Sequence, residues 1–190
     1  MNVKMLRSSF AAVAGVAMVL FGAPDRAKAA DAATPEPKAE ESPIEVSIAI
    51  PWSFDEHREI WSHGSFHVLI TNTSGQPQNI WKAWNSWGYY GLSFEVTDEH
   101  GKTWTVHKGE HIFGPDGPDY WTIDPHESLV IDVDYSSAEW EEGFPPSTKE
   151  PRIFTMRAIF EIKPDGASKK YSVWTGRVVS KVGTYTLYRH

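Results

Sequence analysis

Aromatic side chains are concentrated in one segment of this chain, and their chemistry suits ligand contact. Residues Asn79 to Gly91 (NIWKAWNSWGYYG) include three tryptophans and two tyrosines. Trp and Tyr offer large, rigid contact areas, and they are therefore frequent where proteins hold partners. Such rings could stack on the face of a sugar, anchor a partner protein or lie against a cation. The candidate contact residues are Trp84, Trp87, Tyr89 and Tyr90.

The same segment has a second interpretation, in which its rings close the hydrophobic core where two sheets meet. Trp84 and Trp87 are the rings for which we expect exposure, because Asn85, Ser86 and Gly88 around them favour a loop. Core packing and ligand binding both stay open on the sequence alone. If replacing Trp84 and Trp87 with alanine unfolds the protein, the rings belong to the core.

Histidine pairs with the spacing of metal ligands occur twice, at His63/His67 and at His107/His111. Residues four apart meet on one side of a helix. In a strand they are roughly 13 Å apart, so neither pair could then chelate one ion alone. A loop could still bring His107 and His111 together with an acid such as Asp116. We predict no metal site and no cofactor, with His107 and His111 as the weak candidates.

Motifs of catalysis are missing from the sequence. It contains no GxSxG, HExxH or phosphate-binding loop, and it contains no cysteine. The segment Gly114 to Asp119 has the composition of a calcium loop but not its ligand spacing, so a turn explains it. A carboxylate pair could assemble from distant residues, as in glycosidases, but no motif marks one. We therefore predict a non-enzymatic binding domain with no catalytic residue; a hydrolase or metal-binding protein on the same scaffold is an alternative.

The first 29 residues have the organisation of a secretory signal peptide. Lys4 and Arg7 precede an apolar run from residue 10 to residue 21, and Ala27-Lys28-Ala29 offers cleavage before Ala30. The run is shorter than the roughly 20 residues that span a bilayer, although an uncleaved anchor is the alternative. We predict a signal peptide over 1–29, a disordered linker over 30–43 and one domain over 44–190. The expected location is periplasmic or secreted.

Net charge narrows the classes of partner. The leader carries four basic residues and one acid, so its removal takes the chain from −7 to −10. Binding to a nucleic-acid backbone or an anionic lipid surface requires a positively charged protein surface. The negative net charge of this chain therefore argues against both kinds of partner. We therefore expect a protein or a carbohydrate as ligand, no nucleic acid, and no stable membrane insertion once the leader is removed.

Apolar and polar residues alternate with period two beyond Ile44, which is typical of β-strands. Two segments, Ser136–Gly143 and Asp55–Trp61, could each form a single helical turn. The pattern predicts an all-β protein, an immunoglobulin-like antiparallel sandwich of about eight or nine strands, with a jelly roll as alternative. Strand-like patterns occur in ten segments, at residues 44–50, 66–71, 79–83, 92–97, 103–107, 129–135, 153–162, 171–175, 176–181 and 184–188.

The order of these elements resembles exported bacterial β-sandwich proteins of a planctomycete-like type, over roughly Ile44 to Tyr188. The matching stretches are FHVLITNTSGQP, NSWGYYGLSFEVTDEHGKTW, LVIDVDY, RAIFEI and VWTGRVVS. More distantly, the chain is similar to the BsuPI-type proteinase-inhibitor sandwich, through its Asn-x-Ser turn and the F-x-V-x-D-x-x-G hairpin from Phe94 to Gly101. Because these motifs shape turns and core, the resemblance implies a fold. It suggests a secreted protease inhibitor as an alternative function and transfers no functional residue.

Overall fold

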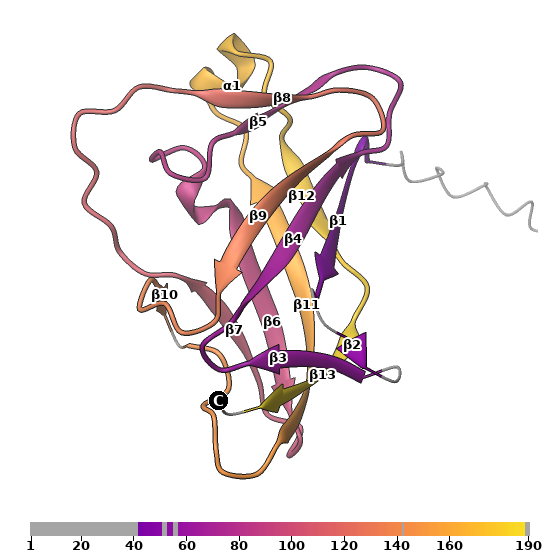
Figure 1. Ribbon diagram of the computed structural model, residues 1–190. Helices are drawn as coiled ribbons and strands as arrows, with labels where there is room; N and C mark the ends of the chain where they lie inside the picture. Colours follow the sequence, from indigo (N-terminus) through magenta and orange to yellow (C-terminus); the bar gives the residue numbers. More distant parts are fainter. Residues whose placement is uncertain (1–41, 51–52, 55–56, 142, 189–190) are drawn as a thin grey trace, which may run out of the picture. The chain divides into compact units, whose positions relative to one another are not determined.

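A computed structural model describes residues 42–50, 53–54, 57–141 and 143–188 of the 190-residue chain (Figure 1). The predicted signal peptide and nearly all of the predicted linker lie outside these residues. Within the described part, no helix has the length and apolar character needed to cross a membrane.

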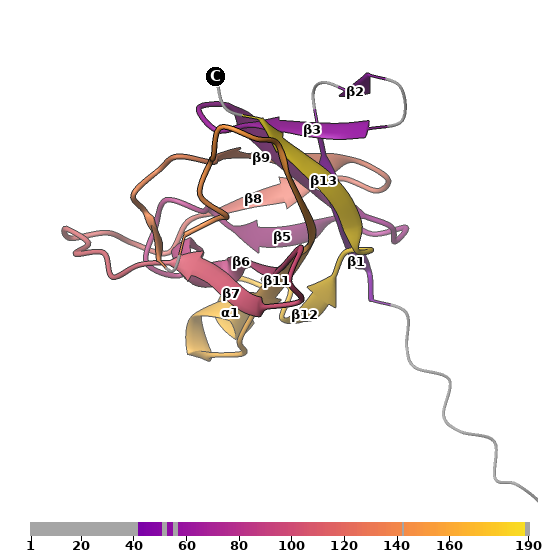
Figure 2. The same ribbon diagram turned by 90° about the horizontal axis from the view of Figure 1, so that it is seen from below.

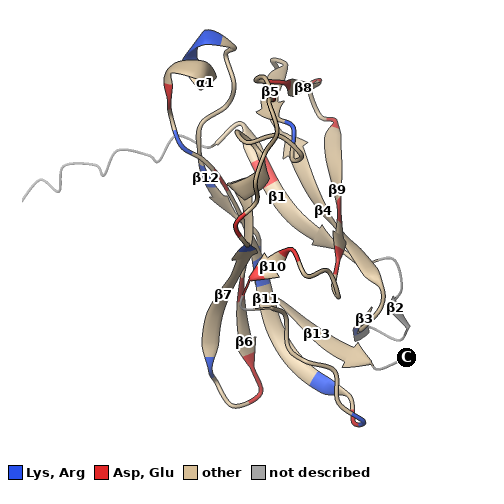
Figure 3. Cartoon of the chain, turned by 90° about the vertical axis from the view of Figure 1, so that its left-hand side faces the viewer, with Lys and Arg blue, Asp and Glu red and all other residues tan. Residues whose placement is uncertain are grey.

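Two sheets form the layers of a sandwich (Figure 3). The smaller sheet is antiparallel, in the order β1 (Ile44–Ala49), β4 (Ser65–Asn72) and β9 (Ser128–Asp134). The larger sheet has the order β10 (Trp140–Glu141), β7 (Thr103–Lys108), β6 (Leu92–Asp98), β11 (Arg152–Ile162), β13 (Gly183–Tyr188), β3 (His57–Trp61) and β2 (Ser53–Phe54), and β12 (Gly176–Val179) also pairs with β11.

Three smaller elements complete the described chain. A two-stranded sheet joins β5 (Gln78–Trp81) to β8 (Tyr120–Ile123). A 3-10 turn, η1 (Tyr89–Gly91), leads directly into β6, and α1 (Gly166–Lys170) follows β11. Between β7 and β8, residues 109–119 project from the sheets as a long loop (Figure 2).

The hydrophobic core lies between the two large sheets and follows the alternation of the sequence. Phe66, Val68 and Ile70 of β4 are fully buried, and so are Phe94 and Val96 of β6. The rings of Phe66 and Phe94 meet edge to face across the layers, with centroids 5.5 Å apart. Aromatic burial therefore joins the sheets in a chain without cysteine, where no disulfide can do so.

The predicted fold class, an all-β sandwich, is confirmed, whereas several predicted details are wrong. Thirteen strands occur in the described residues instead of eight or nine, and β13 pairs with β3 in parallel. Tyr171–Thr175 is a turn with a single bridge from Val173 to Asn79 rather than a strand, because the carbonyls that end α1 hold its first residues. The described part of Asp55–Trp61 holds β3, and the described part of Ser136–Gly143 holds turns and β10. Neither described part forms a helical turn.

Candidate ligand-binding groove

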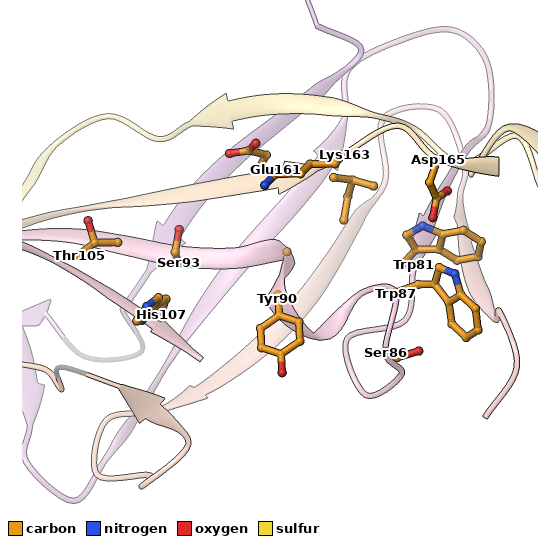
Figure 4. A pocket seen from close by; sticks show the side chains of 12 residues that line it. Trp81, Ser86, Trp87, Tyr90, Ser93, Thr105, His107, Glu161, Lys163 and Asp165 are labelled. Atoms are coloured by element: carbon orange, nitrogen blue, oxygen red, sulfur yellow. The ribbon is translucent and has the colours of Figure 1, made fainter. Parts of the chain in front are cut away.

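An open hollow of about 630 Å³ lies on the outward face of the larger sheet, beside α1 (Figure 4). We call it the groove. Figure 4 shows two tryptophan rings at one end, a tyrosine in the middle, and hydroxyl, imidazole and carboxylate groups toward the other end. Its lining residues are Trp81, Ser86, Trp87, Tyr90, Gly91, Ser93, Thr105, His107, Glu161, Ile162, Lys163 and Asp165.

The polar floor of the groove comes from outward-facing positions on three paired strands. Ser93 of β6 lies opposite His107 of β7, and Thr105 is two residues from His107 on the same face. Glu161 of β11 alternates with the buried Phe160 and therefore also points outward. Because β6 is paired on both sides, by β7 and by β11, its main-chain groups are used in the two ladders. A ligand on this floor is consequently met by side chains.

Aromatic rings form one wall of the groove. Trp81 is only 3% exposed and belongs to the core, where its ring contacts Tyr120 and Tyr171. Trp87 is half-buried and lies over Trp81, with ring centroids 6.2 Å apart and an interplanar angle of 43°. Tyr90, at 52% exposure, is the most open of the three lining rings. Trp81 is thus fixed by the core, and Trp87 is supported by its contact with Trp81.

A buried asparagine fixes the loop that carries Trp87. The side-chain oxygen of Asn85 accepts hydrogen bonds from the amides of Trp87 (3.1 Å) and Gly88 (3.0 Å). Its amide nitrogen donates to the carbonyl of Asp119 at 2.8 Å. Gly88 approaches the chain so closely that an added Cβ would lie 2.3 Å from the carbonyl oxygen of Lys82. Both residues therefore define where the Trp87 ring stands.

The remaining predicted contact residues do not line the groove. Trp84 is 64% exposed, but its ring packs edge-on against Trp121 at 4.7 Å, with the ammonium of Lys82 5.2 Å from the Trp84 centroid. Tyr89 is buried, and the ammonium of Lys108 lies 4.4 Å above its ring. The aromatic segment therefore divides between the core, the groove and a separate surface.

Charge in the groove is mixed. Asp165 caps the N-terminus of α1, and the hydrogen bond from the Ser168 amide is the main reason why the pKa of this carboxyl lies below its ordinary value. Glu161 lies 3.6 Å from the guanidinium of Arg177, and Lys163 adds one cation. Asp165 is therefore an ionised hydrogen-bond acceptor at neutral pH.

The two weak metal candidates lie in different surroundings. The imidazole of His107 faces the groove, 3.9 Å from the carboxylate of Glu141. The ring of His111 packs between aromatic neighbours, and its backbone amide donates to the Tyr90 hydroxyl at 3.2 Å. Asp116 instead accepts a hydrogen bond from the Ser86 amide at 2.9 Å. Among the described residues, no group of three or more His, Cys, Asp or Glu side chains is placed to hold a metal ion.

Sequence reasoning found part of this site. It named Trp87 and Tyr90, which line the groove, and Trp84 and Tyr89, which do not. His107 lies there too, but it was named only for its histidine spacing. The polar residues of β6, β7 and β11 were missed as a group, although their period-two positions already placed them outward. The hairpin of β6 and β7 is predicted by the sequence, whereas the position of β11 beside β6 is not.

No family model matches the chain, and no curated protein matches it significantly in sequence. The function is therefore inferred from the groove itself.

Proposed function

We propose that this protein is an exported, non-enzymatic binding domain that holds its ligand in the groove. The observation that carries the proposal is the meeting of anchored aromatic rings with outward polar side chains around one hollow of about 630 Å³. That volume falls within the roughly 300–1,000 Å³ of typical ligand sites. Rings with a few fixed polar groups are the usual composition of such sites.

The chemistry of the groove favours binding over catalysis. A glycosidase-type acid needs a carboxyl whose pKa is raised so that it holds a proton near neutral pH. The pKa of the groove carboxyl Asp165 is instead lowered, because amide hydrogen bonds stabilise the charged form. Ser93 and Thr105 carry hydroxyls that suit hydrogen bonding to a bound molecule.

Fragment mapping by NMR tests the proposed site while the ligand is still unidentified. A mixed library of small sugars, amino acids and organic cations is added to the isotope-labelled protein. We expect the indole N–H of Trp87 and the amides of Ser93 and Thr105 to shift, whereas the indole of Trp84 does not. Fragments that collect elsewhere, or none that bind, would contradict the proposal.

Paired substitutions provide the matched control, because Trp84 and Trp87 lie in the same loop. Trp87→Ala should weaken fragment binding by about tenfold, the loss expected for one anchoring ring. Trp84→Ala should leave binding within about twofold, since surface changes away from a site have small effects. Thermal unfolding of both variants shows whether either ring is needed for the core.

Export is tested separately from binding. If residues 1–29 are a cleaved leader, N-terminal sequencing of protein recovered from the periplasm or the medium should begin at Ala30. A chain that keeps Met1 and stays with the cells would contradict the export part of the proposal and leave the groove unaffected.

The long loop 109–119 favours a second candidate function, that of a protease inhibitor. Ile112 is 95% exposed at this loop, which is unusual for a large apolar side chain without a partner. An exposed loop with a protruding apolar residue is a shape that a protease cleft could accept. Inhibition assays against a panel of serine, cysteine and metalloproteases, with Ile112→Asp as the control variant, test it; full activity of every protease would reject it.

A further inference from the structure

We infer that the ligand of the groove is a neutral oligosaccharide chain that continues past Asp165 into a second hollow around α1. This inference rests on the proposed function and adds the ligand class. The second hollow measures about 610 Å³ and is lined by Gln78, Pro164, Asp165, Ser168, Lys169, Ser172, Val173, Trp174 and Thr175.

The two hollows are neighbours that share one lining residue. Asp165 lines both of them, and its carboxylate is exposed. Together they exceed the roughly 300–1,000 Å³ that one compact small molecule needs. A ligand that occupies both must therefore be elongated, as an oligosaccharide chain is.

The floor of the groove argues against a peptide strand as this chain. Peptides that bind in extended form add to a sheet edge and pair through their main-chain groups. Here the floor strand β6 lies between β7 and β11, so its main-chain groups are already paired on both sides. Recognition must come from side chains, and hydroxyls, carboxylates and an imidazole are suited to a ligand covered with hydroxyl groups.

The aromatic rings of the groove and the charged side chains of both hollows favour a neutral sugar chain. The negative face of an aromatic ring attracts the partly positive C–H groups on the face of a sugar ring, and Trp87 and Tyr90 supply such rings. Across both hollows the carboxylates of Glu161 and Asp165 are matched by the ammonium groups of Lys163 and Lys169. With that balance, and an overall charge of −7, the site offers no attraction for a polyanion.

Calorimetric titration of the purified full chain tests the ligand class. The probes are neutral oligosaccharides of two to six glucose, xylose, mannose or N-acetylglucosamine units, acidic oligogalacturonides of the same lengths, and a mixture of neutral decapeptides. We expect at least one neutral series to bind, with affinity that rises with chain length, and the acidic series to bind about tenfold more weakly or not at all.

Two variants and one control variant localise the binding. Trp87→Ala should weaken it about tenfold, and Trp84→Ala should leave it within about twofold. Asp165→Asn keeps a good N-cap for α1, and we expect it to weaken the long chains more than the disaccharides. Equal affinity for all lengths, tighter binding of the acidic or peptide probes, or no oligosaccharide binding would overturn the inference.

Failure of this inference is distinguishable from failure of the proposed function. If fragments shift the Trp87 indole while every oligosaccharide fails to bind, the groove is a binding site and the ligand class is wrong. If fragments avoid the groove as well, both proposals are wrong.

Discussion

Asn85 shows how one side chain determines the geometry of a candidate site. All three of its side-chain hydrogen bonds go to backbone groups of the loop that carries Trp87 and of the chain at Asp119. The Gly88 amide and the Asp119 carbonyl keep backbone partners, the Asn85 carbonyl at 3.2 Å and the Lys82 amide at 3.1 Å. Because Asn85 is buried, the Trp87 amide is the group that loses its acceptor, at a cost of roughly 1–3 kcal/mol.

Asn85→Ala should therefore lower the free energy of unfolding by about 2 kcal/mol and weaken ligand binding. Urea denaturation measures the first effect, and the NMR mapping above measures the second. Ser86→Ala is the neighbouring control, since its hydroxyl makes only one long contact of 3.4 Å with Asp116, and it should stay within about 0.5 kcal/mol. Equal stability of the two variants would show that Asn85 does not hold the loop.

Lys108 is a second residue whose environment predicts a measurable effect. Its ammonium lies 4.4 Å from the Tyr89 ring and 5.4 Å from the Trp140 ring, and it pairs with Glu139 at 3.1 Å. Desolvated cation–π contacts contribute about 2 kcal/mol, whereas exposed ones contribute about 0.5–1 kcal/mol.

Lys108→Met keeps the aliphatic stem and removes the charge, so we expect a loss of about 2 kcal/mol in unfolding free energy. Lys102→Met is the matched control, because Lys102 lies over Trp104 at 5.7 Å but is exposed, and it should cost less than about 1 kcal/mol. Chemical denaturation of both variants measures the two losses of unfolding free energy. A larger loss for Lys102→Met than for Lys108→Met would contradict this explanation.

At the scale of elements, period-two alternation predicted those strands that have one face in the core. β4, β6, β9 and β11 occur where the pattern placed them, and the residues expected on the inner face of β11 are buried. β8 and β3 were missed because they are short and show no apolar alternation: among their described side chains only Ile123 of β8 and Ile60 of β3 are buried. The turn after β11 was predicted, but its short helix depends on the capping box of Asp165 and Ser168.

The alternation can be tested on β13, which lies between β11 and β3. Tyr185 and Leu187 face the core, whereas Thr184 and Thr186 face outward. Leu187→Ala should lower the unfolding free energy by about 2–5 kcal/mol, the cost of truncating a buried leucine. Thr184→Ala should change it by less than about 1 kcal/mol. Guanidinium denaturation compares them, and a larger effect of the threonine would mean that the strand faces the other way.

The groove is assembled from segments that lie far apart in the sequence. Groove residues come from β5, the loop that carries Trp87, η1, β6, β7, β11 and the turn before α1, which span the chain from residue 81 to residue 165. Sequence patterns show which way each side chain points within its strand. They predict the hairpin of β6 and β7 but not the pairing of β6 with β11, because that pairing depends on contacts between distant segments. The sequence therefore predicts the aromatic part of the groove but not the polar residues that β6, β7 and β11 contribute to it.

Stability of the whole molecule should depend on pH at both ends of the scale. Asp119, beside the Lys82 ammonium, and Asp165, beside the Ser168 amide, have pKa values below their ordinary value of 3.8. A carboxyl with a depressed folded pKa stabilises the protein above its unfolded pKa, and this contribution disappears as the pH falls through the folded value. At the other end, burial raises the pKa of Tyr135 and Tyr185 above the ordinary value of 10.0. These phenols therefore stabilise the folded protein while they are neutral. Stability falls once the pH is high enough for the same phenols to ionise in the unfolded chain.

We therefore expect an unfolding midpoint that is nearly constant between about pH 5 and pH 9, falls below about pH 4, and falls again above about pH 10. Differential scanning calorimetry across this range, at fixed ionic strength, measures the profile. Asp119→Asn should reduce the acid-side dependence, because the neutral amide no longer exchanges a proton on unfolding. Tyr185→Phe should reduce the alkaline dependence for the same reason. An unchanged acid limb in Asp119→Asn would mean that other carboxyls control acid unfolding, and an alkaline limb that begins well below pH 10 would exclude the tyrosines as its cause.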